Sequence, residues 1–230
     1  MLPQKISELK EHLLSEAALV EHMLINSMQG VLKKDVRLLK EVMEDEEPKV
    51  NDDDRMIEKF CVELIAQSSP VARDLRLALM IIKMNKDLER MGDHAVNVCQ
   101  SGIFLASCSF EDSNDEIKIM SEGAIAMFKD AIKSFASEDI VLANSVCDRD
   151  NIVDDAGDQI LKRLTVIMQS KKSSIHESLH IMRIAYNLER IADLATNIAE
   201  EVIYIVEGED IKHHHYATST DIPSGSILNS

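Results

Sequence analysis

Two groups of oxygen-bearing side chains in this 230-residue chain share one spacing, in which each member follows the last by four residues. The members are Glu89, Asp93 and Asn97 in the first group and Glu189, Asp193 and Asn197 in the second. We call these groups the first and second ladders. Residues four apart lie one above the other on a helix, so each ladder would run along roughly 12 Å of helix surface. Because like charges at this spacing repel each other, we expect a partner that offsets the repulsion in both copies.

A hard cation is one such partner for the second ladder. Asp150, Asp154 and Asp158 have the same spacing and precede this ladder in the chain. In an antiparallel hairpin that turns at residues 170–174, Asp154 and Glu189 lie at similar distances from the turn, so the two acidic faces stand side by side. Carboxylate and amide oxygens are the ligands that hard cations prefer. We therefore predict a metal site, with room for more than one ion, formed by Asp150, Asp154, Glu189, Asp193 and Asn197.

The first ladder has a less regular partner segment. That segment offers Glu46 or Glu47 and then Asn51, with Pro48 between them. Proline lacks an N–H group and clashes with the preceding helical turn, so we expect Pro48 to kink or interrupt this helix. The predicted ligands of this second, poorer metal site are Glu47, Glu89, Asp93 and Asn97.

The ladders also allow interpretations without a metal. The acids could be solvated on an exposed helix face, which is common for a single pair at this spacing. Alternatively, Arg90 and Arg190 follow the ladder glutamates and could neutralise them, although adjacent residues on a helix do not face each other. The duplication of the pattern and the third acidic run favour a cation.

Motifs for catalysis are sparse. Glu177 and His180 have the spacing of a di-iron carboxylate site, but such a site needs this pair on two helices and two further glutamates. The sequence contains no GxGxxG, GxxxxGK[ST] or GxSxG motif. We therefore expect a protein that is not an enzyme, with a carboxylate-bridged metalloenzyme as the alternative.

The apolar residues follow a helical period from residue 4 to about residue 208, with breaks that divide the chain into six helices. In the clearest stretch Ile181, Leu188, Ala195 and Val202 step by seven, which is typical of helices in a bundle. The segment 87–93 (DLERMGD) recurs at 187–193 (NLERIAD). We predict an all-α fold of two tandem three-helix bundles, in residues 1–110 and 111–215, followed by a disordered tail at 216–230.

The composition agrees with this fold and excludes several classes. Aromatic residues make up 3% of the chain and there are only seven glycines, which argues against an all-β protein. The chain has 25 Lys and Arg against 41 Asp and Glu, so we expect no nucleic-acid partner, because phosphate backbones are bound mainly by basic residues. No apolar run approaches the ~20 residues of a membrane span, and the four cysteines are scattered. We expect a cytoplasmic protein that does not insert into a membrane.

Three segments together are similar to the signature of the PhoU family of bacterial phosphate-signalling regulators. They are 69–76 (SPVARDLR), 87–93 (DLERMGD) and 188–198 (LERIADLATNI). The resemblance covers about residues 5–215 and includes the internal repeat. It implies two three-helix bundles related by pseudo-twofold symmetry, and a non-enzymatic adaptor that represses the phosphate-starvation response. The implied partners are the ATPase subunit of a phosphate ABC importer and a sensor histidine kinase, and we also expect a homodimer.

The resemblance also implies metal clusters on paired acidic motifs, as in some members of the family. These motifs fall on the Glu89/Asp93, Glu189/Asp193 and Asp150/Asp154 pairs, with iron as the expected metal and Zn, Ni, Mn or Mg as alternatives. The fourth place, near Glu47 and Asn51, departs from the family pattern through Pro48, an extra residue and an asparagine in place of aspartate. Alternative functions are a carboxylate metal-binding protein, a structural helical scaffold, or an accessory of another phosphate transporter.

Overall fold

The computed structural model describes residues 2–108, 115–171 and 174–208, and no strand occurs in these ranges. Its helices are α1 (Leu2–Lys33), α2 (Val36–Glu41), the π-helix η1 (Val42–Glu46), α3 (Glu47–Ser68), α4 (Ala72–Ala106), α5 (Asp115–Ser137), α6 (Ile140–Cys147), α7 (Asp150–Ser170) and α8 (Ile175–Glu207). In the same ranges no helix is both long and apolar enough to cross a membrane.

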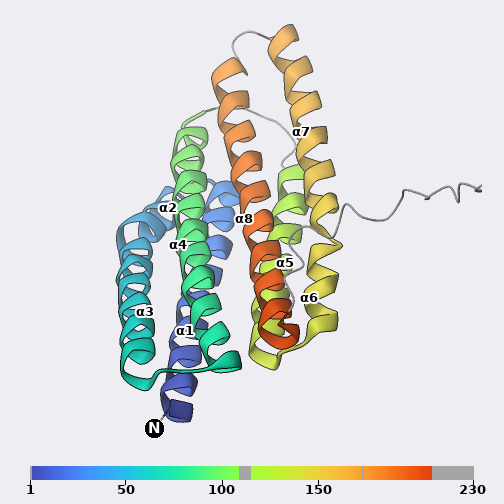
Figure 1. Cartoon of the computed structure of the whole chain (residues 1–230). Helices are drawn as coiled ribbons and strands as arrows, with labels where there is room; N and C mark the ends of the chain where they lie inside the picture. Colours follow the sequence, from blue (N-terminus) through green and yellow to red (C-terminus); the bar gives the residue numbers. More distant parts are fainter. Residues whose placement is uncertain (1, 109–114, 172–173, 209–230) are drawn as a thin grey trace, which may run out of the picture.

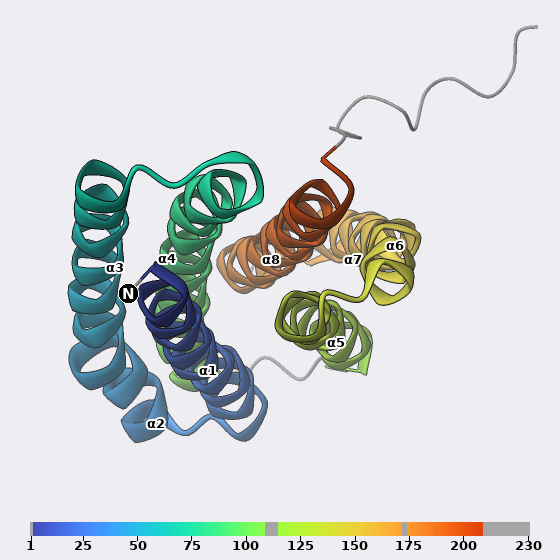
Figure 2. The same ribbon diagram turned by 60° about the horizontal axis from the view of Figure 1, so that its bottom comes forward.

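These helices form six rods, because α2, η1 and α3 continue into one another and only Asp148 and Arg149 separate α6 from α7. Figure 1 and Figure 2 show α1, α2–α3 and α4 as one three-helix bundle and α5, α6–α7 and α8 as another. The predicted all-α fold of two three-helix bundles is confirmed. The predicted boundary at residue 110 and the predicted tail at 216–230 lie outside the described residues.

The first helices of the two repeats end in the same way, 104 residues apart. Lys34 and Glu138 adopt left-handed backbone conformations, with φ of 55° and 53°. Asp35 and Asp139 follow and cap the next helix: Asp35 accepts from the backbone N–H groups of Arg37 and Leu38, and Asp139 accepts from that of Leu142. These side chains satisfy N–H groups that would otherwise be left unpaired at a helix start. The repeat therefore extends to the capping chemistry of both bundles.

An extra residue in the first repeat is absorbed by η1. The buried Val42 and Val146 correspond at a separation of 104 residues, whereas the buried Val50 and Val153 correspond at 103. Between them η1 closes a wider turn, in which the Glu47 N–H group donates to the Val42 carbonyl. Pro48 follows in the first turn of α3, where its missing N–H group does no harm. The predicted disturbance near Pro48 is thus a π-helix that restores the register of α3.

Antiparallel packing of α4 against α8 joins the two bundles, as Figure 2 shows. The apolar faces of the two helices belong to one continuous core. Polar contacts border this interface at both ends: Lys83 Nζ lies 3.5 Å from Glu201, and Arg183 donates to Asn97 at 2.6 Å and to Gln100 at 2.9 Å. Since Lys83 and Arg183 are equivalent in the repeat, the interface is close to twofold symmetric. It turns the acidic positions of α4 and α8 away from each other.

Candidate functional site

Four acids that the sequence predicts as metal ligands lie together between α7 and α8. We call Asp150, Asp154, Glu189 and Asp193 the second-repeat carboxylate cluster. Burial raises the pKa of Asp150 to about 6, and the nearby charges of Asp154 and Asp193 add to this effect. Burial and then the Asp154 charge also raise the pKa of Glu189, while burial and then Asp193 raise that of Asp154. Asp150, Asp154 and Glu189 are thus destabilised as anions by burial and by the neighbouring acids.

Asp150 is the most perturbed member of this cluster. It begins α7, where the partial positive charge of the helix N-terminus should favour an anion. Its Oδ1 atom is nevertheless buried without a hydrogen bond, and the nearby Thr196 hydroxyl lowers its pKa less than burial, Asp154 and Asp193 raise it. The preceding Arg149 is engaged elsewhere, donating to Asp130 at 2.6 Å. The cluster therefore leaves a buried carboxylate oxygen in need of a donor or a cation.

Arg190 supplies part of the compensation. Its guanidinium donates to Asp193 at 2.7 Å and to the Tyr186 hydroxyl at 3.2 Å, and it lies 5.3 Å from the centre of the Tyr186 ring. Arg190 therefore binds the ladder aspartate rather than the glutamate beside it in the sequence. Lys162 similarly lies 3.6 Å from Asp158, at the edge of the cluster.

The cluster has the chemistry of a metal site but not its closed geometry. Its donors are hard carboxylate oxygens, which suit Mg²⁺, Mn²⁺ or iron. Within the described ranges, however, no three His, Cys, Asp or Glu side chains are gathered as a metal ion requires. Asn197 is half-buried one turn beyond Asp193 on α8. The side chains must turn toward a common centre before they can hold an ion.

The predicted first-repeat ligands are more dispersed. Burial, Asp93 and Asp54 raise the pKa of Glu89, so Asp54 on α3 is an acid that faces this ladder and that the sequence did not suggest. Glu47 and Asn51 bond to each other instead, with 2.6 Å between the Asn51 amide nitrogen and Glu47. Asn97 is drawn to the α4–α8 interface, where its amide oxygen accepts from Arg183.

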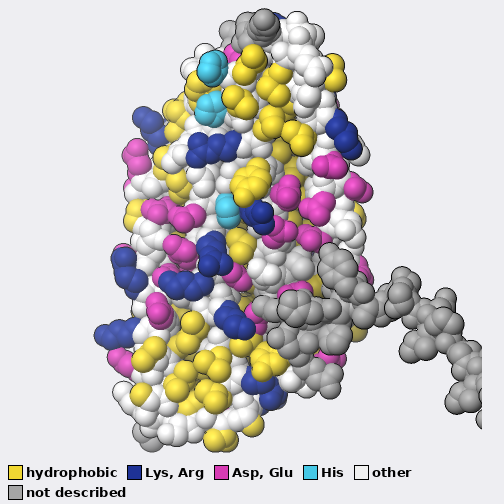
Figure 3. Space-filling view, turned by 45° about the horizontal axis from the view of Figure 1, so that its top comes forward, with side chains coloured by type: hydrophobic (Ala, Val, Ile, Leu, Met, Phe, Trp, Pro, Cys, Tyr) yellow, Lys and Arg dark blue, Asp and Glu magenta, His cyan; other side chains and the backbone are white. Residues whose placement is uncertain are grey.

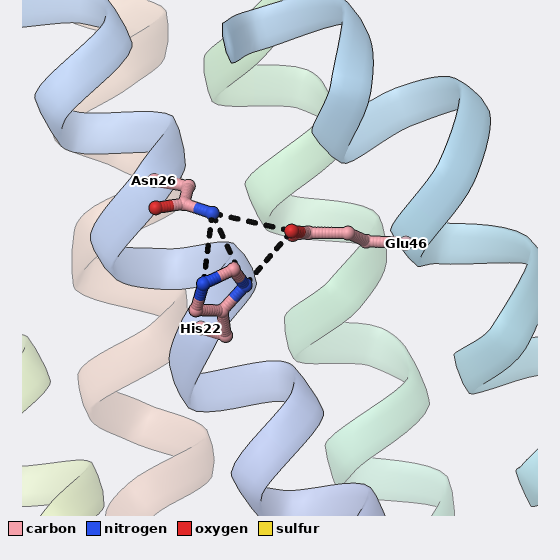
Figure 4. Close-up of polar contacts among 3 residues, drawn as sticks. All are labelled: His22, Asn26 and Glu46. Carbon is pink, nitrogen blue, oxygen red and sulfur yellow. Dashed lines mark hydrogen bonds and ion pairs between the residues drawn. The ribbon is translucent and has the colours of Figure 1, made fainter.

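At the separation of 103 residues, Glu47 and not Glu46 is the counterpart of Asp150, and Figure 4 shows where Glu46 lies. Glu46 is buried and points toward α1, where it contacts His22 Nδ1 at 2.8 Å and accepts from the Asn26 amide at 3.2 Å. In the second repeat, Arg149 and Asp130 make the equivalent contact. Glu46 therefore holds η1 against α1 and does not face the first ladder.

A polar cluster that sequence reasoning missed lies inside the first bundle. Glu16 on α1 is fully buried, and neither of its carboxylate oxygens has a hydrogen-bond partner. Burial, followed by the charges of Asp54 and other neighbours, raises its pKa to about 9. Asp54 accepts from the Asn85 amide at 2.6 Å and from Lys86 Nζ at 2.7 Å. The available signal was the position of Glu16 on the apolar stripe of α1, next to Ala17.

The second repeat has no such cluster at the equivalent positions. When the two bundles are aligned by their buried residues, each member of the first-repeat polar cluster corresponds to a residue without a charge. Glu16, Asp54, Asn85 and Lys86 correspond to Met120, Gly157, Ala185 and Tyr186. The fold therefore does not require the interior charges of the first repeat.

A model of the PhoU domain matches the chain at residues 13–102 and again at residues 117–202. The chain belongs to the PhoU domain family. The two matches correspond to the two bundles, and each contains one ladder pair.

Relatives within the PhoU family cover nearly the whole chain. The "Phosphate-specific transport system accessory protein PhoU homolog" of Pseudomonas putida is 34% identical over 91% of this chain and 82% of its own length. The homolog of that name from Aquifex aeolicus is 34% identical over 92% of this chain and 96% of its own length. The crystal structure of PhoU from Pseudomonas aeruginosa superposes with a TM-score of 0.88 at 32% identity, covering 91% of this chain and all of that one. The resemblance noted in the sequence is confirmed.

Glu16 gives a pH-dependent prediction for this PhoU family member. Its pKa is about 9 in the folded state and ordinary in the unfolded state, so folding takes up a proton between pH 4.5 and 9. The contribution of this proton to the free energy of unfolding is fully present below pH 4.5. It is lost as the pH rises toward 9, by up to about 1.4 kcal/mol per pH unit. Replacing Glu16 with Met, the residue of the other repeat, should remove this dependence.

Urea unfolding of the full chain between pH 5 and 8.5 measures the effect. As the pH rises, the free energy of unfolding of the wild type should fall steadily relative to that of Glu16→Met. The difference between the two proteins should have changed by several kcal/mol, as an order of magnitude, at pH 8.5. Glu8→Gln, which removes an exposed charge from the same helix, is the matched control and should leave the pH slope unchanged. Parallel slopes for the wild type and Glu16→Met would contradict the buried, proton-bearing Glu16.

Proposed function

We propose that this chain is a non-enzymatic accessory protein of a phosphate transport system. The observation that carries the proposal is its similarity to accessory proteins of phosphate-specific transport systems, at 34% identity over about nine-tenths of the chain. In its finer form, the proposal is that the protein represses the phosphate-starvation response. It would do so by linking the ATPase subunit of a phosphate ABC importer to a sensor histidine kinase, as a homodimer in the cytoplasm.

The arrangement of the two repeats supports an adaptor. Figure 2 shows α3 and α7 on opposite sides of the α4–α8 interface. The acidic groups beside these two helices differ in chemistry. In the first repeat Lys86 and Asn85 bind the facing acid Asp54. In the second repeat Asp150 and Glu189 keep raised pKa values, so that surface gains most from a basic partner. Two unlike surfaces on one rigid body suit a protein that contacts two partners.

A deletion strain tests this role. In phosphate-replete cells, loss of the gene should raise alkaline phosphatase, and the wild-type chain should restore repression and co-purify with the importer ATPase or the kinase. The double variant Asp154→Asn/Glu189→Gln should restore less repression, because it removes two of the four carboxylates of the second-repeat carboxylate cluster. Asp52→Asn, an exposed acid on α3, is the control and should restore it fully.

Unchanged repression in the deletion strain, together with recovery of neither partner, would contradict the adaptor role.

As a second candidate function, we propose that the second-repeat carboxylate cluster binds a metal, iron first and Zn, Ni, Mn or Mg as alternatives. The supporting observation is the buried Asp150 oxygen without a hydrogen bond, near Asp154 and Glu189, whose pKa values are raised by burial and by neighbouring acids. A bound cation would lower these pKa values and join α7 to α8. The less convergent first repeat should bind more weakly.

Elemental analysis of protein purified without added metal, followed by thermal unfolding with each ion, tests metal binding. We expect at least one equivalent of metal and a higher Tm, because a ligand that binds only the folded state stabilises it by about 2.7 kcal/mol at one hundred times its Kd. Asp154→Asn should abolish the effect, and Glu47→Gln should preserve it. Less than about a tenth of an equivalent, with no change in Tm, would exclude the site. Oxidase or phosphatase turnover after iron loading would contradict the non-enzymatic role.

A further inference from the structure

A small pocket opens between α7 and α8 beside the second-repeat carboxylate cluster. Its volume is about 190 Å³, and its lining includes Gly157, Met182, Ala185, Tyr186 and the acid Glu189. Most of this lining is apolar, yet it also includes the carboxylates of Glu189 and Asp158. The pocket therefore combines walls that suit an alkyl chain with a charge that suits a cation.

Gly157 keeps the pocket open. A Cβ atom at this position would make a tight contact of 3.3 Å with Met120 Cε and an ordinary contact of 3.5 Å with Glu189 Oε2, so a larger side chain here would occupy the space in front of the glutamate. Helix interiors disfavour glycine by roughly 1 kcal/mol relative to alanine. The tight contact with Met120 is a physical reason for a glycine in the middle of α7.

The first repeat shows what occupies the equivalent space. Asp54 stands at the position of Gly157, Asn85 at that of Ala185, and Lys86 at that of Tyr186. The Lys86 ammonium lies 2.7 Å from Asp54, 3.8 Å from Glu58 and near Glu89, the counterpart of Glu189. The first bundle thus fills this place with a lysine of its own.

The second repeat has acids here but no equivalent lysine. The bases nearest the pocket are already paired, Arg190 with Asp193 and Lys162 with Asp158, the second acid of the pocket lining. The pocket rim is also apolar and accessible, with Leu161 44% and Tyr186 53% exposed. Figure 3 shows acidic side chains gathered next to hydrophobic ones on this side of the molecule. An alkyl chain that ends in a cation matches both parts of this surface.

We propose that the α7–α8 pocket binds a lysine side chain of a partner protein. The methylene groups would pack on Met182, Ala185 and Tyr186, and the ammonium would lie near Glu189, as the Lys86 ammonium lies near Glu89 in the first repeat. The proposal rests on the adaptor function for the existence of a partner protein, and it adds the chemistry by which the second repeat recognises one.

Methionine-methyl NMR of the full chain, labelled with ¹³C in the methionine methyl groups, tests the pocket with n-butylammonium as the probe. Comparison with Met182→Leu identifies the Met182 signal. We expect a saturable shift of this signal at millimolar probe, and at least tenfold weaker binding of the neutral n-pentanol. The buried Met84 in the first repeat should not shift and reports that the fold is intact.

Two variants separate the pocket from general attraction to an acidic protein. Gly157→Leu fills the pocket but keeps every carboxylate, and it should abolish the Met182 shift without loss of the Met84 signal. Glu189→Gln keeps the shape and should weaken binding of n-butylammonium at least tenfold. No saturable shift in the wild type, equal binding of n-pentanol, or an unchanged shift in Gly157→Leu would each overturn the proposal.

Co-purification distinguishes failure of this proposal from failure of the proposed function. Gly157→Leu should recover at least tenfold less of the importer ATPase or of the kinase than the wild type does. Full recovery of both by Gly157→Leu would overturn the partner-lysine proposal and leave the adaptor role intact. If the wild type bound n-butylammonium but recovered neither partner, the adaptor role would fail and the proposal of a partner lysine would fail with it.

Discussion

The packing of α4 against α8 is the constraint on which the rest of the structure depends. These two long helices carry the ladders, contribute to both bundle cores and face each other across a nearly twofold interface. Because their apolar faces are used in packing, the ladder glutamates can lie only at the edge, where α3 and α7 approach. The same interface therefore fixes which helix faces each ladder and how far each acid is removed from water.

Within this shared fold, the acidic side chains of the two repeats have different partners. The first repeat brings in an extra residue at η1, pairs Glu47 with Asn51, and binds Asp54 through Asn85 and Lys86. The second repeat has neither this lysine nor this interior acid, and its four clustered carboxylates are relieved chiefly by Arg190. A group destabilised in the isolated protein is one that gains most from a ligand, so the second repeat is where binding should be concentrated.

Much of this could be predicted from the sequence, because it follows from helical periodicity. The seven-residue steps of α8 and the paired capping aspartates predict the helices, and the hairpin about residues 170–174 places Asp154 beside Glu189. Asn97 departs from its predicted role for a geometric reason. Eight residues along a helix rotate a side chain by about 80°, which moves it off the ladder face and toward Arg183. The approach of Glu16 to Asp54 could not be predicted, because it depends on how three helices pack.

The central claim of this account is that burial and mutual repulsion destabilise the carboxylates of the second-repeat cluster, and the pKa of Asp150 measures this most directly. The measurement is an NMR titration of its carboxyl carbon in chelator-treated full-length protein, with the signal assigned by Asp150→Asn. A midpoint of about 6 that falls in the Asp154→Asn variant is the predicted result. A midpoint near the ordinary aspartate value of about 3.9, unmoved by that substitution, would contradict it.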